Sequence, residues 1–170
     1  RRPPLAVDTP ALLSPAESPP RAKKTRPAAN ATPVSLDALK MGDSLTSDQA
    51  PQVAGRAITI TCEVEPQPGD GVIVSHGGSA MGYTLYLKDN RAVFAVRHAK
   101  QVTRVTSPEL PAGRLTLQAQ LTAEAVLKLS ANGQSVEPVK APGPLAGQPM
   151  EDFDVGFDAK NPVDDYDGSK

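Results

Sequence analysis

Apolar and polar residues alternate in short runs from residue 54 onward. In residues 58–64, apolar side chains occupy every second position, which is typical of a strand with one face in a core. No segment keeps the 3.6-residue period of an amphipathic helix, and turn residues recur about every 8–12 positions. Further strands are expected at residues 72–74, 83–87, 92–96, 101–106, 115–121, 125–130, 135–139 and 153–157.

This pattern predicts an all-β chain. Each half-buried strand needs a second layer over its apolar face, so the strands favour an antiparallel two-sheet β-sandwich. Residues 72–74 are continuously apolar, which predicts a strand covered on both faces. Two polar sequences predict tight hairpin turns: Lys88-Asp89-Asn90-Arg91, and Asn132-Gly133, which accepts the positive φ angles of a type I′ turn.

Composition divides the chain near residue 50. Residues 1–51 hold nine of the 18 prolines, one of the 13 glycines and no aromatic residue, so they lack the side chains that build a core. We therefore expect residues 1–50 to be an extended Pro/Ala-rich linker with one short helical turn near residues 36–40. Residues 51–170 are expected to form the sandwich.

Charge and cysteine content exclude several classes of protein. A formal net charge of -1 argues against a nucleic-acid partner, because such proteins carry a basic excess. No apolar run approaches the roughly 18–20 residues of a membrane-spanning helix. The single cysteine, Cys62, can form neither an internal disulfide nor a zinc site built on cysteines.

Three segments together resemble the concanavalin A-like, laminin-G-like jelly roll. They are the strand–turn–strand at residues 82–94, the strand–Asn-Gly–strand at residues 127–136, and the late strand at residues 153–158. Residues 71–88 resemble more narrowly a module at the C-terminus of bacterial arylsulfatase-type sulfatases. In that module a Gly-Gly-Ser loop likewise precedes a Gly-Tyr-x-Leu-Tyr strand. The resemblance covers about residues 42–168.

The resemblance implies a non-catalytic accessory module of a secreted or periplasmic sulfatase-type hydrolase. Such a module would act by contact with a glycan or by docking on the catalytic domain upstream in the parent chain. The sulfatase motif Cys/Ser-x-Pro-x-Arg does not occur here, so we assign no catalytic residue. Two alternatives stay open: a structural or adhesion module of an unrelated surface protein, and a glycan-cleaving enzyme. The Glu-x-Asp-x-x-Glu run of glucanases with this fold is absent, which argues against the enzyme.

The last strand of that jelly roll pairs beside the first, whereas this chain stops at Lys170 in an acidic loop. We therefore expect the final strand to be missing, and the strand at residues 58–64 to have an unfilled neighbour unless another segment fills it. An exposed edge of this kind invites pairing with another chain.

Basic residues gather on the expected strands between residues 88 and 104. If the ligand is a sulfated or other polysaccharide, these side chains would hold it through charge-assisted hydrogen bonds. Tyr86 has the opposite strand phase from Leu85 and Leu87, so its ring would stack on a sugar. The alternative is the ordinary polar face of a half-solvated sheet. The candidate ligand-binding residues are Tyr86, Arg91, Arg97, His98, Lys100 and Arg104.

Residues 151–167 contain seven acids, opposed only by Lys160. Calcium prefers six to eight oxygen ligands, and a carboxylate-rich loop at a sandwich rim supplies several. A structural calcium ion is therefore one hypothesis and a solvated acidic loop the other, with no further cofactor expected. The candidate calcium ligands are Asp154, Asp158, Asp164, Asp165 and Asp167.

Overall fold

The computed structural model describes residues 36–65, 69–158 and 162–166. These residues form eleven β-strands and one 3₁₀ helix, η1 (Leu36–Ala38), and contain no α-helix, which confirms the all-β prediction. η1 lies within residues 36–40, where a short helical turn is expected. Residues 1–35, most of the expected linker, lie outside the described residues. No helix in the described ranges has the length and apolar character needed to cross a membrane.

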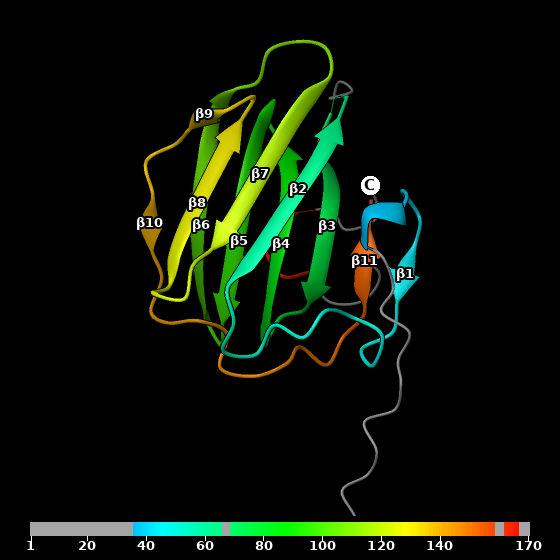
Figure 1. The fold of residues 1–170 in the computed structure, drawn as a ribbon, viewed down its shortest axis with the longest axis vertical. Coiled ribbons are helices and arrows are strands. Elements are labelled where there is room, and N and C mark those ends of the chain that lie inside the picture. The colour runs from blue at the N-terminus through cyan, green and yellow to red at the C-terminus, as the bar shows by residue number, and fades with distance from the viewer. Residues whose placement is uncertain (1–35, 66–68, 159–161, 167–170) are drawn as a thin grey trace, which may run out of the picture. The chain divides into compact units, whose positions relative to one another are not determined.

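The strands form two antiparallel sheets packed face to face (Figure 1). The six-stranded sheet has the order β1-β11-β3-β4-β5-β6, and the second sheet has the order β10-β8-β7-β2, with β9 paired to β8. The strands are β1 (Ser44–Leu45), β2 (Ile58–Val64), β3 (Gly71–Gly77), β4 (Met81–Lys88), β5 (Arg91–His98), β6 (Gln101–Glu109), β7 (Leu115–Leu121), β8 (Val126–Ala131), β9 (Gln134–Ser135), β10 (Val139–Lys140) and β11 (Phe153–Val155).

The core lies between the two sheets. Along β7, buried residues alternate with exposed or half-buried ones, as the sequence pattern predicts. Leu117 and Leu121 of β7 are fully buried, and so is Phe94 of β5 in the opposite sheet. Burial of such a side chain contributes about 1.5–3 kcal/mol relative to exposure, so these facing rows hold the sheets together.

The six-stranded sheet is apolar on both faces near its centre. Val72 belongs to a second cluster on the outer face, with Tyr86, Val93 and Ala95, whereas Val74 belongs to the main core. A register shift between Val72 and Val74 lets their side chains point to opposite faces of the sheet. β3 is therefore a strand covered on both faces, as its continuous apolar run predicts.

Both predicted hairpin turns have left-handed backbone conformations. The φ angles are 50° at Asp89, 60° at Asn90, 48° at Asn132 and 80° at Gly133. Two successive positive φ angles are the mark of the type I′ turn, whose twist matches that of the flanking strands. The turns therefore set the registers of the β4–β5 and β8–β9 pairs.

The sandwich begins before residue 51, the boundary that composition predicts. β1 pairs with β11, and Leu45 and Ala50 are buried in the core, so residues 44–50 belong to the sandwich. A two-residue strand is too short to show an alternating pattern, so the sequence gives no sign that residues 44–50 belong to the sandwich.

β2 lies at the end of its sheet and pairs only with β7 in the part of the chain that the structure describes. Within these described residues, no strand lies on the other side of residues 58–64.

Candidate functional site

A recess of about 410 Å³ lies on the outer face of the six-stranded sheet. Three neighbouring strands each supply it with one cation: Lys88 from β4, Arg91 from β5 and Arg104 from β6. Lys88 and Arg91 are opposite each other across the β4–β5 turn, and strand pairing brings Arg104 to the same recess from β6 although it lies further along the sequence. The recess is lined by Tyr86, Lys88, Asp89, Arg91, Val93, Arg104, Thr106 and Asp165.

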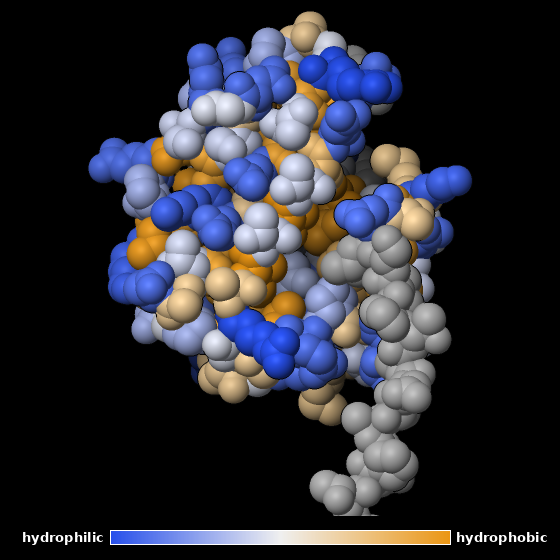
Figure 2. Space-filling model, in the orientation of Figure 1, coloured by the Kyte–Doolittle hydropathy of each residue, from blue (hydrophilic) through white to orange (hydrophobic). Residues whose placement is uncertain are grey.

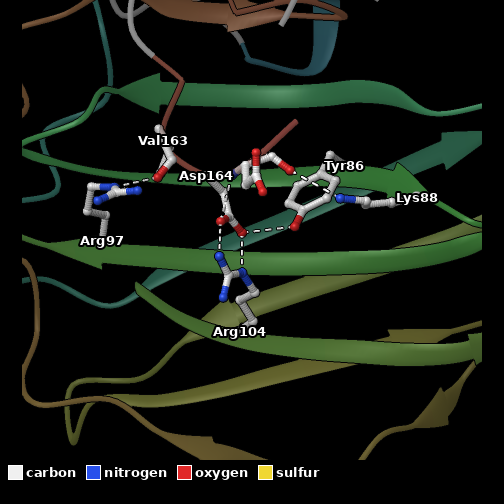
Figure 3. Close-up of polar contacts among 7 residues, drawn as sticks. Tyr86, Lys88, Arg97, Arg104, Val163 and Asp164 are labelled. Atoms are coloured by element: carbon white, nitrogen blue, oxygen red, sulfur yellow. Dashed lines mark hydrogen bonds and ion pairs between the residues drawn. The ribbon is translucent and has the colours of Figure 1, made fainter. Parts of the chain in front are cut away.

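Asp164 is the central acceptor beside this recess (Figure 3). Arg104 donates to both of its carboxylate oxygens, with Nε 2.6 Å from Oδ2, and Tyr86 donates its hydroxyl to Oδ2 at 2.9 Å. The Asp164 side chain is fully buried, whereas that of Arg104 is 47% exposed. Burial alone would raise the pKa of Asp164, but the hydrogen bonds from Arg104, the Asp165 backbone and Tyr86 hold the pKa below its usual value. Asp164 is therefore a buried, ionised carboxylate.

Two further cations hold the segment that contains Asp164. Arg97 Nε donates to the Val163 carbonyl oxygen at 2.5 Å, and Lys88 Nζ donates to the Asp165 carbonyl oxygen at 3.3 Å (Figure 3). Residues 162–166 thus lie across the outer face of the sheet, where Arg104 neutralises Asp164 and the other two cations bind backbone carbonyls. The basic surface and the acid-rich segment, which the sequence analysis treats separately, are in direct contact.

Tyr86 occupies the strand phase expected for it, but its ring is covered. The residue is only 3% exposed, and the Tyr166 ring lies against it with centroids 4.8 Å apart. Burial, followed by the neighbouring Asp164 carboxylate, raises the pKa of Tyr86. In this structure the Tyr86 ring has no open face on which a sugar could stack, because residues 162–166 cover it.

The other basic candidates separate into two groups. Arg91 and Arg104 line the recess, whereas His98 lies at the far end of β5, with its Nε2 3.0 Å from the Pro144 carbonyl oxygen. Lys100 is exposed in the turn after β5, and Arg97 is half-buried against Val163. The structure also adds Lys88, which belongs to the basic run but not to the candidate set. Its position directly opposite Arg91 follows from the predicted hairpin turn.

The structure does not bring the described candidate calcium ligands together. Asp154 accepts a hydrogen bond from Ser44 Oγ at 2.5 Å, and Asp158 accepts one from Tyr166 at 2.5 Å. Asp164 is paired with Arg104, Asp165 is exposed, and Asp167 lies outside the described residues. Over the described ranges, no three His, Cys, Asp or Glu side chains gather as metal ligands would. The calcium site stays a prediction.

His76 of β3 is a titratable group inside the core, beneath this face. It is fully buried, with its Nδ1 3.1 Å from the Tyr83 hydroxyl and its ring edge-on to Tyr83 and Phe153. Burial lowers the pKa of His76 to about 4, against a smaller opposing effect of the Asp154 charge. His76 is therefore neutral near pH 7 and packs as an aromatic core residue.

Comparison with known proteins identifies the fold. No family model matches the sequence. No curated protein sequence matches it either. Among solved structures, the mouse laminin α1 chain, domains LG4-5, superposes with a TM-score of 0.54 and 16% identity. The match covers 65% of this chain and 30% of that one, so the chain spans under a third of the laminin structure's length. Sheep galectin-11 gives a TM-score of 0.45 and 11% identity over 71% of this chain and 96% of the galectin.

The laminin match shows that the described chain is a laminin-G-like β-sandwich. The jelly-roll prediction is thereby confirmed at the level of the fold. Neither of the solved structures named here is a sulfatase. The similarity to a sulfatase module rests on the resemblance of residues 71–88 alone.

Proposed function

We propose that this chain is a non-catalytic binding module that holds an anionic glycan at the recess formed by Lys88, Arg91 and Arg104. The observation that carries the proposal is the convergence of one cation from each of three neighbouring strands on a single recess. Ammonium and guanidinium groups form short, strong hydrogen bonds with sulfate and carboxylate oxygens. A sulfated or otherwise acidic polysaccharide presents such oxygens along its length, so this is the ligand class that we propose.

The cations of the recess remain accessible to a ligand. Arg91 is 45% exposed, and its only ion pair in the described residues is a 4.0 Å contact with the exposed Glu109. Exposed ion pairs of this kind contribute about 0–1 kcal/mol, so Arg91 can exchange Glu109 for a ligand at little cost. Arg104 keeps a 47% exposed side chain although its guanidinium binds Asp164.

The parent that we propose is a secreted or periplasmic bacterial hydrolase of the sulfatase type. Its catalytic domain would lie upstream in the same chain, and the module would hold the polysaccharide near it or dock on it. The support is the resemblance of residues 71–88. In this segment the structure explains why two positions are glycine. A Cβ on Gly77 would lie 2.3 Å from the Met81 carbonyl oxygen, and one on Gly82 would lie 2.4 Å from the His76 carbonyl oxygen. The Gly-Gly-Ser connection therefore depends on close contact between two backbones.

Binding of the full chain to heparin-like and uncharged glycans tests the anion recess. We expect binding to the sulfated glycan only, and at least a tenfold loss in the Lys88→Gln/Arg91→Gln variant, because two charge-assisted contacts disappear. The matched control, Arg56→Gln/Lys128→Gln, removes the same charge from exposed residues outside the recess and should bind as the wild type does. Equal losses in both variants, or no binding to any charged glycan, would refute the proposal.

A further inference from the structure

The free edge of β2 differs from the other sheet edges of the described fold. β2 pairs with β7 over all seven residues in an uninterrupted register, from Ile58 opposite Leu121 to Val64 opposite Leu115. Alternate residues of such a strand direct their backbone N–H and C=O groups away from the partner. The outer edge of β2 can therefore form a second row of backbone hydrogen bonds with another strand. The edges at β1 and β10 are two residues long, and the edge strand β6 contains Pro108. β2 is long and regular and contains neither proline nor lysine, the residues that usually protect an edge.

A cleft of about 1150 Å³ lies beside this edge, between β2 and strands β3 and β11 of the opposite sheet. Figure 2 shows apolar surface recessed next to β2, on the side toward β1 and β11. Six apolar side chains along the cleft are only half-buried, although they pack on the core, so the two sheets remain open here. The half-buried apolar residues of the cleft are Leu39, Ile60, Cys62, Val64, Ile73 and Val155.

Among the described residues, every charged residue that lines the cleft is acidic and exposed. In the same part of the chain Glu63 has one counter-charge, the Arg114 guanidinium at 3.6 Å, in a pair whose two side chains are 66% and 70% exposed. An exposed pair of this kind neutralises little of the local field. An occupant with basic residues between its apolar ones would therefore complement the cleft. The four acids are Asp37, Glu63, Glu65 and Asp70.

We propose that this cleft binds an extended segment of a partner polypeptide, which adds a strand beside β2. The backbone of the segment pairs with the outer edge of β2, and every second side chain enters the cleft against Ile60, Cys62 and Val64. The side chains between them face solvent on the side of Glu63. The segment is therefore aliphatic at one set of alternate positions and rich in lysine or arginine at the other. A match to all seven residues of β2 spans about 23 Å.

A second copy of this chain fits the cleft less well than a single strand does. β11 and β1 continue the six-stranded sheet past β2 (Figure 1). Two copies joined edge to edge through β2 would place these strands of both copies in the same layer, where they would overlap. A lone extended segment meets no such obstacle.

The probe is a fluorescent nine-residue peptide that alternates valine with threonine and lysine and carries a charge of about +3, which complements the acidic rim. A scrambled peptide of equal composition and an alternating peptide with glutamate for lysine are the controls. We expect the full chain to bind the alternating basic peptide at least tenfold more tightly than either control. Cys62, the only cysteine, lies in the cleft, so peptide binding should also slow its alkylation. Burial raises the pKa of Cys62 to about 11, so iodoacetamide, an uncharged reagent used at alkaline pH, is suitable.

Charge variants locate the binding on the molecule. Glu65→Gln/Asp70→Gln should weaken the alternating peptide at least fivefold, whereas Glu109→Gln/Asp165→Gln, with the same charge change outside the cleft, should not. Lys88→Gln/Arg91→Gln should leave peptide binding unchanged, which separates this proposal from the anion recess. The proposal is overturned if the peptides bind equally or not at all, or if both acidic variants behave alike. A dimer that itself protects Cys62, or protection of Cys62 in the monomer without peptide, would also overturn it.

Discussion

Replacing Asp164 with alanine removes the centre of the contacts that hold residues 162–166 on the six-stranded sheet. The carboxylate accepts hydrogen bonds from Arg104, from Tyr86 and from the backbone N–H of Asp165. In the variant the Tyr86 hydroxyl stays buried without its acceptor, which costs about 1–3 kcal/mol. Arg104 is 47% exposed and can turn to water, so its lost partner adds less than that of a buried charge.

Together these effects predict a loss of about 2–3 kcal/mol in the free energy of unfolding, or about 5–10 °C in Tm. Urea unfolding followed by circular dichroism measures it. The double variant Tyr86→Phe/Asp164→Ala should regain part of the loss, because no hydroxyl is then left without an acceptor. Asp165→Ala is the matched control, since the exposed Asp165 side chain has no bond to the sheet in the described structure and only its backbone contacts Lys88.

The same substitution has an opposite effect on the proposed ligand. Arg104 loses the carboxylate that occupies it, so the recess becomes more basic and binding of a heparin-like glycan should strengthen severalfold. A stability loss below about 0.5 kcal/mol would show that Asp164 does not hold the segment, since such a change is typical of an ordinary surface site. Weaker glycan binding by a folded variant would place the ligand away from Arg104.

Three further predictions follow from single groups. The pKa of His76 is about 4 in the folded protein and 6.5 as a free side chain, so protonation favours the unfolded state. The free energy of unfolding therefore has its full value above pH 6.5 and decreases as the pH falls toward 4. Urea unfolding should show a loss of about 3 kcal/mol across that range, and His76→Phe should remove most of it. Gly77→Ala combines a φ of +96° with a backbone clash and should cost about 2 kcal/mol or more, whereas Gly113→Ala, with φ +97° in open space, should cost about 1 kcal/mol by thermal unfolding. If the acid-rich segment holds calcium, calorimetric titration should give a saturable heat that the Asp164→Ala/Asp165→Ala variant lacks, and equal heats would contradict a site there.

Local features of the structure were accessible from residue order alone. The alternation in residues 115–121 predicts β7, and Asn132-Gly133 predicts the turn before β9, because both depend on side-chain direction and φ preference within a few residues. The opposition of Lys88 and Arg91 follows from the turn between them. The strand at β1 escaped prediction, since two residues carry no period.

The candidate site depends on contacts that residue order does not encode. Arg104 and Asp164 are 60 residues apart in the sequence. From the sequence, the basic strands and the acidic segment look like two separate binding sites, whereas in the structure they contact each other. The buried state of Tyr86 has the same cause, because a strand phase shows which face a residue occupies but not what covers that face.

Residue order predicts the longer strands, their apolar faces, the tight turns and the class of sandwich. Each of these follows from the twofold period of an extended chain and from backbone preferences that act between near neighbours. Only the folded structure shows which strands pair across the two sheets and which charges neutralise one another. Those outcomes depend on the packing of whole sheets, where the burial of apolar surface selects among pairings that look alike locally.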